Sequence, residues 1–152
     1  MTTDPPVDID ALKKKYVGQE SSPTVLEVEE GHIVAFAEAI GDPNPMWNDE
    51  AAARRLPSRG MAAPPTFLRA ARTGGIDIAS ETPLQRILDG GSQWEYHELV
   101  RPGDRITVVT RIDDMTLRSG RLGPMLFVTT VTTYTNQFLQ VAATQKSTLI
   151  RY

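Results

Sequence analysis

From about Ser92 onward the sequence has the pattern of β-strands. Val, Ile, Thr and aromatic residues alternate with polar residues for much of this half, and short sequences typical of turns, such as "RPG", "RSGRLGP" and "TNQ", interrupt them. This pattern predicts four strands joined as an antiparallel meander, over about residues 92–100, 104–114, 125–136 and 138–152. A sheet with an apolar face must be covered, so the part of the chain before Ser92 has to supply its packing partners.

Before Ser92 the sequence predicts mainly helices. Apolar residues recur at helical spacing over about residues 31–40, and Gly41 stands where such a helix would end. A central helix is expected from about Pro65 to the pair Gly74 and Gly75. The other expected elements are a short helix in "ALKKKYVGQE" that ends near Gly18, a strand in "SPTVLEVEE", and a short helix in "NDEAAARRL" with Asn48 as its N-cap.

These elements predict an α+β fold in which an antiparallel sheet curls around one central helix. Small residues Ala70 and Ala71 would let that helix lie close to the sheet. The length fits one domain, over residues 11–152, behind a flexible tail of residues 1–10. A strongly curved sheet has open edges, and pairing with a neighbouring chain is a common way to protect them, so we expect a dimer.

Composition excludes several classes of function. The formal net charge of -3 gives no general reason to bind nucleic acid or an anionic membrane, and no apolar run is long enough to cross a bilayer. The chain has no cysteine and only two histidines, so disulfides, cysteine nucleophiles and a metal site are not expected. Because no apolar run stands near the N-terminus, we expect a cytoplasmic protein.

The stretch "GDPNPMW" at residues 41–47 combines an acid, an amide and a large aromatic residue. Asp42 and Asn44 are candidates for contact with a substrate, although Asx residues beside prolines also form turns with their own backbone. Trp47 is expected to pack in the core or in an interface, and so to fill or reshape a pocket, because a buried indole contributes a large apolar area.

The order of "GDPNPMWNDEAAA", "GMAAPPTFL" and "GGSQWEYHELVRPGD", followed by long strands, resembles the MaoC-type dehydratases, which have the hot-dog fold and are relatives of (R)-specific enoyl-CoA hydratases. More narrowly, "APPTF", "WEYHELVRPGD" and "GPMLFVTTVTTYTN" resemble the N-terminal, fatty-acid-synthase-like dehydratase branch of that group. The resemblance implies an acyl thioester of coenzyme A or of an acyl carrier protein as the substrate, no cofactor, and a role in fatty acid metabolism.

The sequence departs from the active members of that group at one position. Their motif is Gly-Asp-x-Asn-Pro-aliphatic-His, and this chain has Trp47 in place of the histidine. Hydration of an enoyl thioester needs one group to take a proton from water and another to give a proton to the α-carbon. Indole nitrogen only donates and does not titrate near neutral pH, so Asp42 is expected to be a vestige of the catalytic pair. His97 is a candidate replacement base, or else a histidine on a half-exposed strand, and His32 is expected to be solvated.

Two further sets of residues are candidate contacts for a thioester substrate. Free backbone N–H groups at the start of a helix can bind a carbonyl oxygen, and by analogy with the family Gly60 and Met61 would supply them. Guanidinium groups match phosphate geometry, so an arginine cluster is a candidate dock for coenzyme A, with a solvated helix face as the alternative. Its members are Arg54, Arg55, Arg59, Arg69 and Arg72.

The sequence therefore supports a main hypothesis and two alternatives. The chain would be the histidine-lacking subunit of a heteromeric enoyl-thioester hydratase, or 3-hydroxyacyl dehydratase, in which a homologous hot-dog subunit carries the intact Asp and His. The first alternative is a non-catalytic homodimer that binds acyl-CoA. The second is a hot-dog thioesterase, which ranks last because "TFLRAARTGG" carries no carboxylate to activate water.

Overall fold

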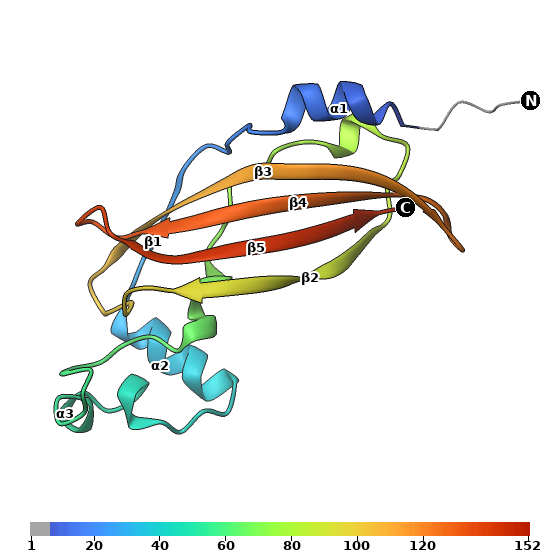
Figure 1. Cartoon of the computed structure of the whole chain (residues 1–152). Helices are drawn as coiled ribbons and strands as arrows, with labels where there is room; N and C mark the ends of the chain where they lie inside the picture. The colour runs from blue at the N-terminus through green and yellow to red at the C-terminus, as the bar shows by residue number, and fades with distance from the viewer. Residues whose placement is uncertain (1–6) are drawn as a thin grey trace, which may run out of the picture.

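The computed structural model describes residues 7–152 and contains one five-stranded antiparallel sheet. The strand order is β1-β3-β4-β5-β2 (Figure 1). Strands β3, β4 and β5 form a meander, but the predicted four-strand meander is wrong for β2, which pairs with β5 at the far edge of the sheet and not with β3. The strands are β1 (Thr24–Glu27), β2 (Ile87–Tyr96), β3 (Arg105–Gly120), β4 (Gly123–Thr135) and β5 (Val141–Arg151). The antiparallel sheet itself is confirmed, although β2 begins and ends earlier than predicted and β3 continues into the expected turn as far as Gly120.

The helices all lie before β2 in the chain, and most begin close to the predicted positions. Helix α1 (Ile9–Tyr16) is capped by Asp8, whose carboxylate accepts from the N–H of Ala11. It therefore begins before the predicted end of the tail at residue 10; residues 1–6 lie outside the described residues. Helix α2 (Glu30–Ala39) ends as predicted before Gly41, where φ is +69°. In α3 (Glu50–Ala53) the N-cap is Asp49, not Asn48, because the Asp49 carboxylate accepts from the N–H of Ala52.

The central helix predicted over residues 65–74 is much shorter in the structure. Only a 3-10 helix, η2 (Pro65–Ala70), forms there, and Ala71 already has an extended backbone. Contacts with the start of β1 and with the residues before it explain the early end. The Arg72 carbonyl accepts from the Thr24 hydroxyl, and Gly74 lies so close to the Ser22 carbonyl oxygen that a side chain would collide with it. The two glycines therefore allow close packing, and the chain runs on without a helix to the short η3 (Ala79–Glu81).

All of these elements pack on one face of the sheet, which we call the covered face. Its core has two clusters. In the first, α2 and η2 pack on Ile106, Val108 and Tyr134; in the second, α1 and the segment before β2 pack on Ile112 and Val128. Figure 1 shows the segment of residues 65–80 running behind the strands from the α2 side to the α1 side. The covered face is thus spanned by an extended segment between its two core clusters.

Strand β2 is an open edge of the sheet. It pairs with β5 on one side, with a register irregularity between Asp89 and Ser92, and it is the last strand of the sheet on the other side. Along its length all residues but Trp94 are exposed, including Ile87 at 58% and Leu88 at 43%. Ten residues of open edge with exposed apolar side chains are a template for pairing with another strand.

Candidate functional site

The loop of residues 41–47 forms two successive side-chain turns. The Asp42 carboxylate accepts from the N–H of Asn44 at 3.0 Å, and the Asn44 amide oxygen accepts from the N–H of Met46 at 2.9 Å. The second turn starts the 3-10 helix η1 (Pro45–Trp47), for which Asn44 is the N-cap. Both polar residues therefore have the turn-forming role that was the alternative to substrate contact.

Trp47 lies in the first core cluster with only 9% of its surface exposed. Other members of that cluster are Met61, Phe67 and Val100. The indole Nε1–H is buried and has no hydrogen-bond partner. The prediction that Trp47 packs in the core is confirmed, and the indole nitrogen is a donor without an acceptor.

The loop before η2 does not offer the free N–H groups that the sequence led us to expect. Gly60 donates to the Ala53 carbonyl at 3.2 Å, and Met61 donates to the Glu50 carboxylate at 3.0 Å. The prediction of free donors at these two residues is therefore wrong, because α3 and its first-turn glutamate lie against this loop.

Glu50 and Arg101 hold the same loop in place. Glu50 also accepts from Arg54 at 2.8 Å, and the hydrogen bonds from Arg54 and from the Met61 N–H lower the pKa of Glu50 below its ordinary value of 4.5. The Arg101 guanidinium donates to the carbonyls of Ser58 and Met61 at 2.6 and 3.3 Å. The Glu50 carboxylate and the Arg101 guanidinium thus fix the loop at Ser58 and at Met61.

The predicted arginine cluster is divided in the structure. Arg54 and Arg59 line a surface cavity of about 350 Å³ with Arg101, and the carboxylates of Glu30 and Glu50 line it too. Arg69 lies elsewhere, with its guanidinium 3.4 Å from the Ser92 hydroxyl on β2. The exposed side chains of Arg55 and Arg72 are not in the lining of that cavity.

Three aromatic rings form a stack beside Arg69. Trp94 lies between Tyr96 and Tyr134, with ring centroids 5.8 and 5.4 Å apart. Burial raises the pKa of Tyr134 to about 12, and its hydroxyl donates to the Gln145 side chain at 3.3 Å. Burial also raises the pKa of Tyr96, although nearby Arg69 acts in the opposite direction. The stack runs from the core to the open edge of the sheet.

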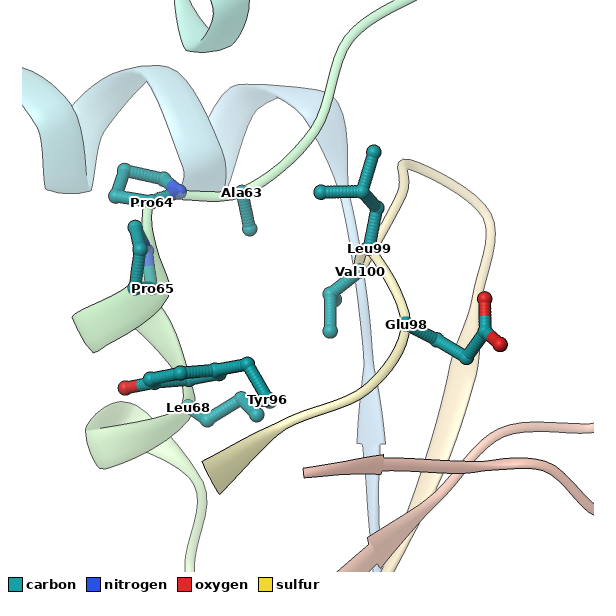
Figure 2. Close-up of a pocket in the computed structure, with 8 residues that line it drawn as sticks. All are labelled: Ala63, Pro64, Pro65, Leu68, Tyr96, Glu98, Leu99 and Val100. Atoms are coloured by element: carbon teal, nitrogen blue, oxygen red, sulfur yellow. The ribbon is translucent and has the colours of Figure 1, made fainter. Parts of the chain in front are cut away.

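Tyr96 also lines a small apolar pocket of about 70 Å³ (Figure 2). Pro64 and Pro65 stand on one side of it and Leu99 and Val100 on the other, while the Glu98 carboxylate points away. The pocket lies at the start of η2, close to the end of β2.

Neither histidine completes an acid/base pair with Asp42. His97 follows the last residue of β2 and is exposed, and its backbone N–H donates to the Ala142 carbonyl at 2.8 Å. His32 is also exposed and lies 3.9 Å from Glu29. Within residues 7–152 no hydrogen bond or ion pair joins either histidine to Asp42.

The sequence reasoning missed the roles of Glu50 and Arg101. Glu50 stands four residues before Arg54 on a predicted helix, a spacing that favours an ion pair and was a usable signal. Arg101 acts over a separation of about forty residues, on Ser58 and Met61, and such a contact leaves no trace in local sequence patterns.

No helix among the described residues has the length and apolar character needed to traverse a lipid bilayer.

Comparison with other proteins identifies relatives of this chain. A UPF0336 protein of Streptomyces avermitilis is 35% identical over 116 residues, which cover 72% of this chain and 77% of that protein. A probable enoyl-CoA hydratase alpha subunit of Thermomonospora curvata is 29% identical over 135 residues. The match covers 77% of this chain but only 42% of that longer protein.

Solved structures agree on the fold. The MaoC-like dehydratase of Rhodospirillum rubrum superposes with a TM-score of 0.74 at 26% identity, covering 93% of this chain and 95% of that one. The ChsH1-ChsH2 complex of Mycobacterium tuberculosis contains a chain that matches with a TM-score of 0.75 at 20% identity, covering 95% and 93%. The family model of the FAS1-like dehydratase domain region matches residues 15–145. The chain therefore belongs to the FAS1-like dehydratase domain family and has the α+β hot-dog fold of the MaoC-like dehydratases.

Proposed function

We propose that this chain is a histidine-lacking subunit of a heteromeric enoyl-thioester hydratase, in which a homologous hot-dog subunit supplies the complete Asp and His pair. The observation that carries the proposal is the state of Trp47. By the resemblance to the family motif it stands at the histidine position; it is buried in the core, and its nitrogen cannot accept a proton.

The groups around Trp47 support the same proposal. Asp42 and Asn44 form turns with their own loop, and the N–H groups of Gly60 and Met61 donate to acceptors within the chain. A catalytic site for hydration needs a free proton acceptor and a free donor for the thioester oxygen. The N–H groups of Gly60 and Met61 are therefore not free to hold the thioester oxygen, and within residues 7–152 neither histidine is hydrogen-bonded to Asp42 to complete an acid/base pair.

The open edge of β2 supports the proposed partnership. A second hot-dog subunit with a similar edge can add its own strand in antiparallel register and so satisfy the outward backbone groups. One relative is named an alpha subunit, and one structural neighbour is a complex of two differently named chains. By extension, this chain pairs with a homologous subunit and contributes part of the acyl-thioester pocket.

The test is co-expression with hot-dog proteins encoded beside this gene, followed by mass measurement and an enoyl-CoA hydration assay. We expect a stable complex that hydrates 2-enoyl-CoA. A homodimer that binds acyl-CoA and gains no activity with any partner would instead support a non-catalytic binding module. Hydrolysis of the thioester, measured as free coenzyme A, would support a thioesterase.

The edge itself is tested by Ile87→Lys, with Val25→Lys on the opposite edge strand as the matched control. Both side chains are exposed in the single chain, at 58% and 52%, so neither substitution should unfold it. We expect Ile87→Lys alone to abolish co-purification of the partner, because it places a charge in the new strand pair. Equal loss in both variants contradicts pairing through β2.

A further inference from the structure

Two rows of polar side chains cross the middle of the covered face. In an antiparallel sheet, residues opposite each other point to the same face, so the register defines the rows. Each row has one residue from β3, β4, β5 and β2, in that order. The first row is Thr110, Thr132, Gln145 and Trp94. The second row begins at the apolar Ile112 and continues with Thr130, Ser147 and Ser92.

Apolar rows flank these polar rows on both sides. Val108, Tyr134 and Ala143 form the row toward α2, and Val128 and Leu149 belong to the row toward α1. The polar rows therefore coincide with the gap between the two core clusters. A sheet face that only had to pack against its own chain would be apolar across this gap as well.

A cavity of about 120 Å³ opens over this gap. Its walls are the extended segment that follows η2, represented by Gly74, Ile76 and Ile78, and the strands below, which contribute Thr110 and Thr130. The remaining lining is apolar except for Arg151, whose guanidinium donates to the Leu84 carbonyl at 3.5 Å. The side chains of Thr110, Thr130 and Ser147 are only half-buried, whereas Ser92 at the open edge is exposed. Thr130 lines the cavity itself, and Ser147 and then Ser92 follow it in the same row toward the open edge of the sheet.

Some of the polar groups bond to one another and others do not. The Thr110 and Thr132 hydroxyls share a hydrogen bond of 2.9 Å, and the Gln145 carbonyl oxygen accepts from Tyr134, which leaves the Gln145 amide hydrogens free. Within residues 7–152, the hydroxyls of Thr130 and Ser147 form no hydrogen bond with protein atoms. Donors therefore remain available at the centre of the covered face.

On the basis of the proposed function, we infer that the acyl group held by this chain bears an oxygen, as a keto or hydroxyl group, in the part remote from the thioester. The hydroxyls of Thr130 and Ser147 donate to that oxygen while the flanking apolar rows hold the hydrocarbon on either side. A plain hydrocarbon chain would remove these hydroxyls from water without giving them a partner, which is unfavourable.

The experiment measures acyl-CoA binding by calorimetry to the assembly that co-purifies with this chain. The probes are dodec-2-enoyl-CoA and a series with one keto group at successive carbons of the distal half. One neutral hydrogen bond contributes about a threefold to tenfold gain in affinity, so at least one keto isomer should bind tighter than the plain chain by that factor. The variant Thr130→Val with Ser147→Ala should lose this preference and bind the plain chain unchanged or tighter.

The matched control is Thr129→Val with Thr148→Val, a directly opposed pair that points to the other face of the sheet. It should keep the preference for the keto isomer. If the plain chain binds as tightly as every keto isomer, or if the control loses the preference as fully as the test variant, the inference is wrong while the proposed function stands. If no acyl-CoA binds at all, the proposed function fails with it.

Discussion

Replacement of Trp47 by Phe tests whether this residue serves only to pack. Truncation of a buried Trp to Ala costs about 3–5 kcal/mol of unfolding free energy, and Trp47 is buried to the same degree as such residues. Phe keeps most of that packing and also removes the indole N–H, which is buried without a partner. An unsatisfied buried donor costs about 1–3 kcal/mol, so its removal offsets the lost volume. We therefore expect Trp47→Phe to lie within about 1 kcal/mol of the wild type, while Trp47→Ala loses the full amount.

The assay is urea unfolding followed by far-ultraviolet circular dichroism, since the substitutions change the fluorescence. Trp94→Phe is the control, because this ring stacks on two tyrosines and its loss has no compensating gain; about 1 kcal/mol is expected. A loss above about 3 kcal/mol for Trp47→Phe would show that the indole nitrogen has an acceptor in solution, and would refute the interpretation of Trp47 as a packing residue.

Three other predictions follow from the same structure. Trp47→His should not create hydratase activity, since the Met61 N–H remains bonded to the Glu50 carboxylate and so cannot hold the thioester oxygen; a gain of about 10²-fold over background contradicts this. The pKa of Glu50 is lower in the folded chain than in the unfolded chain, so its contribution to stability is present above pH 4.5 and is lost as the pH falls through the folded pKa. In Glu50→Gln the unfolding free energy should therefore decline less steeply toward acid pH, and an unchanged decline would contradict this role of Glu50. Gly74→Ala should lower the melting temperature, because the new methyl group meets the Ser22 carbonyl oxygen, whereas Gly75→Ala, with open space around it, should not.

The strands could be predicted because the alternation of apolar and polar residues can be recognised within each segment of the sequence. The order of the strands in the sheet depends on tertiary contacts. The Val, Thr and Ile pattern of β3 to β5 follows from the face that each residue presents, and helix α2 follows from Ile33 and Ala37 at helical spacing. The length of the central helix was predicted wrongly because its end depends on tertiary contacts. The bond between Thr24 and Arg72, together with the close approach of Gly74 to Ser22, outweighs the helical preference of "TFLRAAR".

The candidate site divides in the same way. Trp47 was recognisable from the motif, and the structure confirms its burial. The N–H groups of Gly60 and Met61 were assigned by analogy with the family, but contacts with Glu50 and Ala53 decide whether they are free. The polar rows on the covered face depend on the register of four strands, including the irregularity in β2, so no segment considered alone reveals them.

The most direct test of the proposed division of labour is steady-state hydration of 2-enoyl-CoA by the assembled complex carrying Asp42→Asn in this chain. Because the proton-transfer groups are expected on the partner, we predict a rate within about threefold of the unmodified complex, and no turnover by this chain alone. A loss of about 10²-fold or more on Asp42→Asn, or hydration at ordinary enzyme rates by the purified single chain, would contradict the account.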